Sequence, residues 1–270
     1  MTDAGQETPD HIPDHMELRA VELPTPDGVV KGRIAVTRGQ MGLSGLVRTA
    51  CALTDGLVAR AVQLERQAGR ALTCAAGCGA CCRHMVPVSP PEAIHLVETI
   101  ESLGSERRGK AMDAFGRVIA VLERHRLIAD LFDPPPTDEP ILPAARKYFE
   151  LGLACPFLRN GSCVIHPQRP IACRDYNVSS PADWCDTPYD KDVAKIPMPM
   201  PLSVSLARLT AKLTGDRPCL IPLTLAPRWV EQNQVLRRRN WPGLELFDRF
   251  LAEIGASPGD ADGDRLRATL

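Results

Sequence analysis

Four of the chain's ten cysteines fall within nine residues, in the stretch CAAGCGACC at positions 74–82. On a helix the four thiols would share one stripe, and free cysteine packs well as a small hydrophobe. Gly77 and Gly79, however, would each cost a helix interior about 1 kcal/mol, whereas glycine suits a loop that folds back on itself. Thiolates that converge in such a loop are ligands for zinc or iron. The stretch therefore predicts a metal centre.

A second cysteine group follows in the stretch CPFLRNGSCVIHPQRPIACR, which begins at Cys155. Its dipeptide Asn160-Gly161 predicts a tight hairpin turn. In the simplest register Cys155 and His166 share one face while Cys163 lies on the other. A single bulged residue would reverse this arrangement. The register therefore leaves open which of these side chains bind metal.

The two groups, together with one cysteine shortly after them, supply eight thiols, while Cys51 and Cys219 stand apart in apolar stretches. We expect those two to be buried and free of metal. One tetrahedral zinc needs only four ligands, so eight thiols suit either two sites or a multinuclear iron–sulfur cluster. The predicted metal ligands are Cys74, Cys78, Cys81, Cys82, Cys155, Cys163, Cys173 and Cys185.

Several polar residues near these cysteines have more than one interpretation. Arg169 and Arg174 flank the last cysteine of the second group, where they either donate hydrogen bonds to metal-bound thiolates or lie on the surface. His84 is either a ligand, a hydrogen-bonding partner of a sulfur or a surface residue. The sequence leaves these alternatives open, and it does not decide whether His166 or Cys185 ligates.

The composition indicates an ordinary globular protein. Apolar residues make up 44% of the 270 residues, charged residues 24%, and the net charge is −1. This balance gives no reason to expect nucleic acid or an anionic membrane as a partner. The N-terminus lacks the pattern of a secretory signal, and no apolar run is long enough to span a bilayer. We therefore expect a cytoplasmic protein, in which clustered cysteines bind metal rather than form disulfides.

The elements that must position the cysteines are expected to be mainly helical. Two β-branched runs around the turn PDG predict a short hairpin between residues 19 and 37. The motif SPPE, which starts at Ser89, is a capping box that predicts the start of a helix. A helix that begins near residue 105 should stop at Asp133 and the three prolines behind it. Helical periodicity predicts helices over residues 43–72, 90–103, 105–132, 143–153, 227–239 and 243–254.

We expect these elements to form one mainly α domain with a short hairpin and an irregular, loop-rich cysteine centre. The segments on either side of residue 210 are punctuated by prolines, and no internal repeat is present. The predicted divisions are an N-terminal tail and hairpin (1–42), a helical metal-binding domain (43–190), a proline-punctuated helical extension (191–255) and a tail (256–270).

The stretch CGACC, followed by CPFL and GSCVIHPQRPIACR, resembles the YkgJ-like cysteine-cluster family, which is named for a CxxCxxCC pattern. The resemblance covers about residues 74–185 and implies zinc or iron chelation without a settled reaction. Three residues rather than two separate the first two cysteines here, and His166 stands where relatives often have tyrosine, which argues against it as a ligand. Carried over by position, the family's cluster cysteines are Cys74, Cys78, Cys81, Cys82, Cys155, Cys163 and Cys173.

Three other functions share parts of this pattern. Radical S-adenosylmethionine enzymes use the same spacing of three cysteines, but the helices that follow here are not the β/α barrel of that class. Flagellin lysine methylase resembles the same family and would need a methyl donor and an iron–sulfur cluster, yet no glycine-rich cofactor loop follows a buried strand here. A zinc-finger module is a further alternative, although its best basic stretch, LRRRNWPG at 236–243, also suits a helix end.

We therefore expect a cytoplasmic metal-binding protein with a cysteine-ligated iron–sulfur cluster or zinc. Its partner is the metal ion or cluster, and neither nucleic acid nor a membrane is expected. The sequence assigns no reaction and no protein partner.

Overall fold

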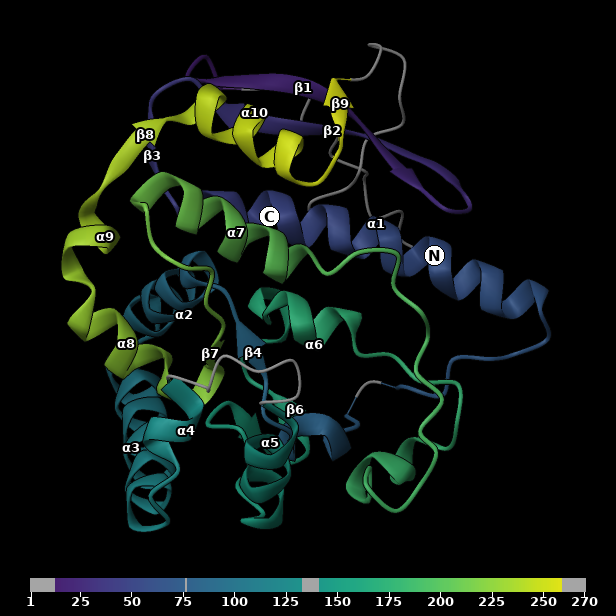
Figure 1. Ribbon diagram of the computed structural model, residues 1–270, viewed down its shortest axis with the longest axis vertical. Coiled ribbons are helices and arrows are strands. Elements are labelled where there is room, and N and C mark those ends of the chain that lie inside the picture. The colour runs from purple at the N-terminus through teal and green to yellow at the C-terminus, as the bar shows by residue number, and fades with distance from the viewer. Residues whose placement is uncertain (1–12, 76, 133–140, 259–270) are drawn as a thin grey trace, which may run out of the picture.

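The computed structural model describes residues 13–75, 77–132 and 141–258 (Figure 1). Within them the α-helices are α1 (Gly45–Gln67), α2 (Pro90–Ser102), α3 (Ser105–Arg124), α4 (Ile128–Phe132), α5 (Ile141–Glu150), α6 (Ile171–Asp175), α7 (Leu202–Thr214), α8 (Ala226–Gln232), α9 (Gln234–Arg238) and α10 (Gly243–Glu253). The strands are β1 (Met16–Thr25), β2 (Gly28–Thr37), β3 (Gln40–Gly42), β4 (Pro87–Val88), β5 (Leu158–Arg159), β6 (Ser162–Cys163), β7 (Ile221–Pro222), β8 (Asn240–Pro242) and β9 (Ser257–Pro258). The chain is thus a single, mainly α domain, as expected.

The predicted N-terminal hairpin forms, and it is longer than expected. β1 and β2 pair antiparallel over their whole length, from Met16 opposite Thr37 to Thr25 opposite Gly28. The short strand β9 adds to the other edge of β1, so that the sheet has the order β2-β1-β9. This pairing ties Ser257 to the sheet.

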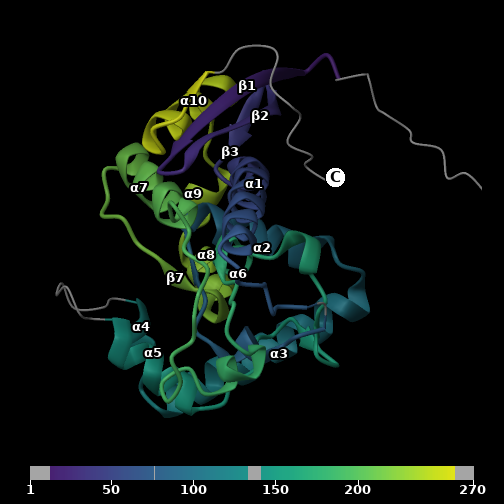
Figure 2. The ribbon, with the colours of Figure 1, turned by 90° about the vertical axis from the view of Figure 1, so that its right-hand side faces the viewer.

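Two buried hydrophobic cores lie one above the other along the molecule. The upper core packs the N-terminal sheet against α1, α7 and α10, with Leu46, Leu206 and Phe247 at its centre. The lower core packs α2, α3, α5 and α8 around Phe115 and Phe157. α2 and α6 lie between the two regions in both views (Figures 1 and 2). Both cysteine groups lie in the half of the molecule that contains the lower core.

Two helices flank the first cysteine group, and the second of them begins at the capping box that the sequence predicts. In the capping box of α2, the backbone N–H of Ser89 donates to Glu92 Oε2 at 2.8 Å. α1 follows the expected periodicity but ends at Gln67, five residues before the predicted end. Gly69 adopts a φ of 76°, a left-handed conformation that favours glycine. Irregular chain then continues to Cys74.

Other predicted helices are divided. The helix expected over 105–132 is broken between α3 and α4, where Arg126 has a φ of 57° and Leu127 N donates to Leu122 O at 3.0 Å. The break lets Leu127 and Leu131 pack into the lower core. A similar interruption at Asn233 separates α8 from α9. The predicted stop at Asp133 and the prolines behind it lies outside the described residues.

Contacts between distant segments were not foreseen. α7 lies within the predicted proline-punctuated helical extension, at a place where no individual helix was predicted, and its apolar face is buried in the upper core. β3 pairs with β8 and β4 pairs with β7, so that the C-terminal segments are tied to the first half of the chain. No helix in the described parts of the chain combines the length and apolarity required to cross a membrane.

Candidate metal centre

The Asn160-Gly161 turn forms as predicted and folds the second cysteine group back on itself. Asn160 and Gly161 have φ values of 49° and 77°, both in the left-handed region that a type I′ turn requires. The ladder of β5 and β6 ends at Cys163, so the expected pairing of Cys155 with His166 does not form. Cys155 and Cys163 instead both pack against the edge of the lower core.

The first cysteine group forms a turn rather than a helix, and it packs directly on this hairpin. A Cβ atom on Gly161 would lie 3.3 Å from the Gly77 carbonyl oxygen, and one on Gly79 would lie 3.2 Å from the Gly161 carbonyl oxygen. Such contacts are tighter than most side chains tolerate. Glycine therefore lets the two cysteine-bearing backbones approach each other closely.

A backbone hydrogen bond joins the two cysteine groups. Cys155 N donates to Cys82 O at 2.7 Å. Cys81 and Cys82 lie together in the 3-10 helix η1 (Ala80–Arg83). Segments more than 70 residues apart in the sequence are thus fixed side by side.

Cys173 enters the centre from α6, and a buried glutamate of α2 fixes the start of that helix. Glu92 is only 2% exposed. Its Oε1 accepts a hydrogen bond from Ile171 N at 2.9 Å, and its Oε2 accepts from Ser203 Oγ at 2.5 Å and from Ser89 N. The capping motif was visible in the sequence, but nothing in the motif indicated that the same carboxylate would also hold α6 and α7.

Four thiols lie within electrostatic reach of one another, and we call them the hairpin set: Cys81, Cys155, Cys163 and Cys173. Burial and then the neighbouring thiols raise the pKa of Cys155 to about 12. The same two causes raise the pKa of Cys173, and burial raises that of Cys163. The neighbouring Cys82 thiol is the largest cause that raises the pKa of Cys81, and burial is the second. The surroundings therefore disfavour thiolates unless a cation compensates them.

Three further thiols form a second neighbourhood, which we call the loop set: Cys74, Cys78 and Cys185. Cys81 lies within reach of both Cys74 and Cys185, so it stands between the two sets. Burial is the main cause that raises the pKa values of Cys74 and Cys185. Cys78 is exposed, whereas Cys185 is 3% exposed. The loop set thus extends from the interior to the solvent.

The two arginines have different roles. The charge of Arg169 partly offsets the rise in the pKa values of Cys81 and Cys163, so this guanidinium lies near the hairpin set. Arg174 is buried and bonds to Asp55 of α1 at 2.7 Å and 2.9 Å, and to the carbonyl oxygens of residues 167 and 169. Arg174 therefore clamps the loop before Cys173, while Arg169 is the one near the sulfurs.

The two candidate histidines each contact another part of the cysteine region. His84 Nε2 lies 2.7 Å from the carbonyl oxygen of Cys185, which only accepts, so this nitrogen carries a proton. Burial lowers the pKa of His84, which keeps the ring neutral. His166 starts the 3-10 helix η2 (His166–Gln168) and is exposed, with its ring bonded to Arg169. The two rings therefore orient other groups.

The lone cysteines lie apart from both sets, although one of them is not buried. Cys51 is half-buried against the upper core, where burial raises its pKa to about 12. Cys219 is exposed, which corrects the expectation that it packs in an apolar interior. It lies in the loop after α7, and burial of the apolar run begins only at Ile221.

The donor chemistry of the centre fits a soft metal, although the thiols do not yet form a closed coordination shell. Among the residues that the structure describes, no three His, Cys, Asp or Glu side chains stand in an arrangement that could hold a metal ion. Thiolates are nevertheless the ligands that zinc and iron–sulfur clusters share, and a bound cation offsets the repulsion between them. The hairpin set offers the four ligands that either group needs.

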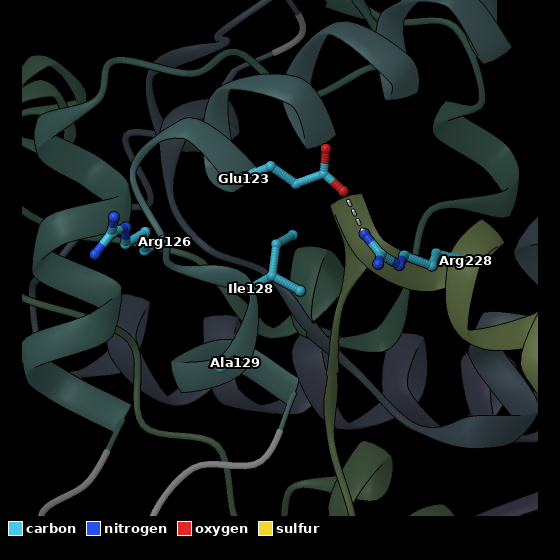
Figure 3. A pocket seen from close by; sticks show the side chains of 5 residues that line it. All are labelled: Glu123, Arg126, Ile128, Ala129 and Arg228. Atoms are coloured by element: carbon cyan, nitrogen blue, oxygen red, sulfur yellow. Dashed lines mark hydrogen bonds and ion pairs between the residues drawn. The ribbon is translucent and has the colours of Figure 1, made fainter.

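One surface hollow lies elsewhere, at the end of α3 (Figure 3). It has a volume of about 250 Å³ and is lined by Glu123, Arg126, Ile128, Ala129 and Arg228. Arg228 bonds to Glu123 at 2.7 Å across it. None of the cysteine-bearing segments lines this hollow, so it is separate from the centre.

Comparison with known families identifies the cysteine region. Residues 73–193 match the family model CxxCxxCC, which is described as a proposed zinc- or iron-chelating domain. Comparison with the curated proteins and with the solved structures finds no match for the chain. The matched residues include both the hairpin set and the loop set. Residues 73–193, which are somewhat less than half of the chain, are therefore similar to the CxxCxxCC family.

Proposed function

We propose that the chain binds zinc or an iron–sulfur cluster through thiolates of residues 73–193. The observation that carries this proposal is the packing of the first cysteine group on the hairpin of the second, through the hydrogen bond from Cys155 N to Cys82 O and the close contact of Gly161 with Gly77. Four thiolates complete either a tetrahedral zinc site or the shell of a four-iron cluster.

The surroundings of these thiols support a structural role for the metal. The centre lies where the glycine-containing turn, the hairpin and α6 meet, and each of these elements is short. Such elements bury little apolar surface of their own, so bonds to a common metal would contribute directly to folding. Arg169 supports the same proposal, because its charge offsets the excess negative charge of four thiolates.

The loop set supports a second part of the proposal. Cys74, Cys78 and Cys185 supply three more thiols, and Cys81 lies close enough to be shared. This arrangement favours either a second metal near the first or one larger cluster. We expect the protein to act in a reducing compartment such as the cytoplasm, where these thiols remain free to bind metal.

The experiment is anaerobic purification of the full chain, followed by analysis of zinc and iron and by a visible absorption spectrum. An iron–sulfur cluster would give iron with broad visible absorption, and a zinc centre would give zinc without it. Either result, at one or more metal atoms per chain, supports the proposal. A folded chain that contains neither metal, and that takes up neither after reduction, would overturn it.

A further inference from the structure

The helix that carries Cys173 is too short to hold a metal ligand in place by itself. α6 has only five residues, and isolated helices shorter than about 12–15 residues are marginal in water. Its start is held from α2, through the hydrogen bond from Ile171 N to Glu92 Oε1. The rest of the helix, which includes Cys173, needs a second attachment.

Arg174, the residue next to Cys173, attaches α6 to α1. Its Nη1 atom donates to Asp55 Oδ1 at 2.9 Å and to Asp55 Oδ2 at 2.7 Å. Its Nε atom donates to the carbonyl oxygen of Arg169 at 3.0 Å, and its Nη2 atom donates to the carbonyl oxygen of Pro167. One guanidinium therefore ties together α1, α6 and the loop that precedes α6.

Asp55 is the carboxylate that balances the charge of this guanidinium. The Arg174 side chain is 9% exposed, whereas the Asp55 side chain is 52% exposed. A buried cation that loses its partner is strongly destabilising, so we expect Arg174 to leave its present position when the carboxylate is neutralised. The two hydrogen bonds to the carbonyl oxygens of the loop would be lost with it.

We propose that Asp55 is a positioning residue for the hairpin set, which acts through Arg174 to hold Cys173 in place for metal binding. This inference rests on the proposed function and extends it to α1, which lies outside residues 73–193 that match the family model. Groups that orient the ligands of a metal contribute to its affinity although they do not touch it. The N-terminal half of the chain is thus part of the metal centre.

The test compares two full-length variants that each neutralise one half-exposed carboxylate. Asp55→Asn removes the charge that pairs with Arg174 and keeps the size of the side chain. Glu123→Gln is the matched control, because the Glu123 side chain is 53% exposed and bonds to Arg228 at 2.7 Å, at the hollow that is separate from the centre.

Each protein is measured in two states. The reduced, metal-free protein is treated with iodoacetamide, and mass spectrometry follows the rate of alkylation at each cysteine. A second sample is loaded with cobalt(II) under anaerobic conditions and titrated with a chelator, which gives the metal affinity.

We expect Asp55→Asn to weaken cobalt affinity about tenfold. In the metal-free protein it should also speed alkylation at Cys173, because α6 opens more often. Alkylation at Cys155, which packs on the lower core, should keep the wild-type rate. Glu123→Gln should match the wild type in all of these measurements.

A second variant tests whether Asp55 acts through Arg174. Arg174→Lys keeps the positive charge but not the planar fork that reaches several acceptors, so it should also weaken cobalt affinity. Adding Asp55→Asn to Arg174→Lys should then change the affinity little, because the two residues act as one unit.

Two results would overturn the inference while the proposed function stands. One is equal cobalt affinity in Asp55→Asn and Glu123→Gln. The other is an equal rise in alkylation at Cys173 and Cys155, which would mean that Asp55 stabilises the whole fold rather than α6. A wild type that neither binds cobalt(II) nor takes up iron and sulfide would instead overturn the proposed function.

Discussion

The hairpin set and the loop set contain the same kind of ligand but are held in different ways. The four thiols of the hairpin set stand on backbone that is joined by hydrogen bonds and close glycine contacts, and two of them pack on the lower core. The loop set has an exposed member, Cys78, and the His84 ring bonds to the backbone carbonyl of Cys185. From this difference we expect the hairpin set to contribute more to the stability of the fold than the loop set does.

The largest expected effect comes from losing a ligand of the hairpin set. Cys173→Ser should remove bound metal and lower the Tm by about 10 °C, because a loss of about 3 kcal/mol has that effect in a chain of this size. Metal analysis and calorimetry of the same sample measure both quantities. Cys78→Ser, in the loop set, is the control and should change the Tm by much less. If Cys78→Ser lowers the Tm more than Cys173→Ser does, the loop set rather than the hairpin set stabilises the fold.

The next effect tests whether α2 positions the hairpin set. Glu92→Gln replaces a buried carboxylate that accepts several hydrogen bonds with an amide, whose NH2 group can only donate. The substitution should lower the free energy of unfolding by about 2–3 kcal/mol. Metal affinity should fall together with stability, because the Glu92 carboxylate accepts the hydrogen bond from Ile171 N at the start of the helix that bears Cys173. Urea denaturation with and without metal provides the measurement.

Glu101→Gln is the matched control for that change. Glu101 lies on the same helix, is exposed and pairs with Arg237, so its loss should cost no more than about 1 kcal/mol. Equal destabilisation by the two substitutions would show that Glu92 has no special connection to the cysteines.

A smaller effect is expected at the contact between the two cysteine groups. Gly161→Ala places a Cβ atom on left-handed backbone and 3.3 Å from Gly77 O, which should cost about 1–2 kcal/mol. Gly109→Ala is the control, because this position lies in α3 with open space around it, and alanine should stabilise the helix by up to about 1 kcal/mol. Thermal unfolding of both variants should give shifts of opposite sign. A Gly161→Ala protein as stable as the wild type would argue against the close contact.

The smallest effects are expected at the lone cysteines. Cys51→Ala should cost about 1 kcal/mol because the thiol is half-buried beside the upper core, and Cys219→Ala should cost almost nothing because that residue is exposed. Metal per chain should stay at the wild-type value in both. Loss of metal in either variant would place a ligand outside the two sets.

Local patterns in the sequence were enough to predict the parts of the fold that are set by neighbouring residues. The hairpin turn at Asn160-Gly161, the capping box at Ser89 and most of α1 each depend on interactions within a few residues. The eight clustered cysteines were likewise visible as a group. Their roles as ligands remain a proposal, and so do the divisions of the chain.

Other features depend on contacts between distant segments and leave no local pattern. The pairing of β4 with β7 involves only two residues on each side, and α7 follows a run of prolines. The division of the thiols into two sets arises only when the turn around Gly77 packs on the hairpin.

The central claim is that the hairpin set binds the metal, and metal content per chain tests it most directly. Wild type, Cys173→Ser and Cys219→Ser are purified anaerobically side by side, and zinc and iron are measured in each. We predict equal metal in the wild type and Cys219→Ser, and its loss in Cys173→Ser. Equal metal content in all three proteins would contradict the claim.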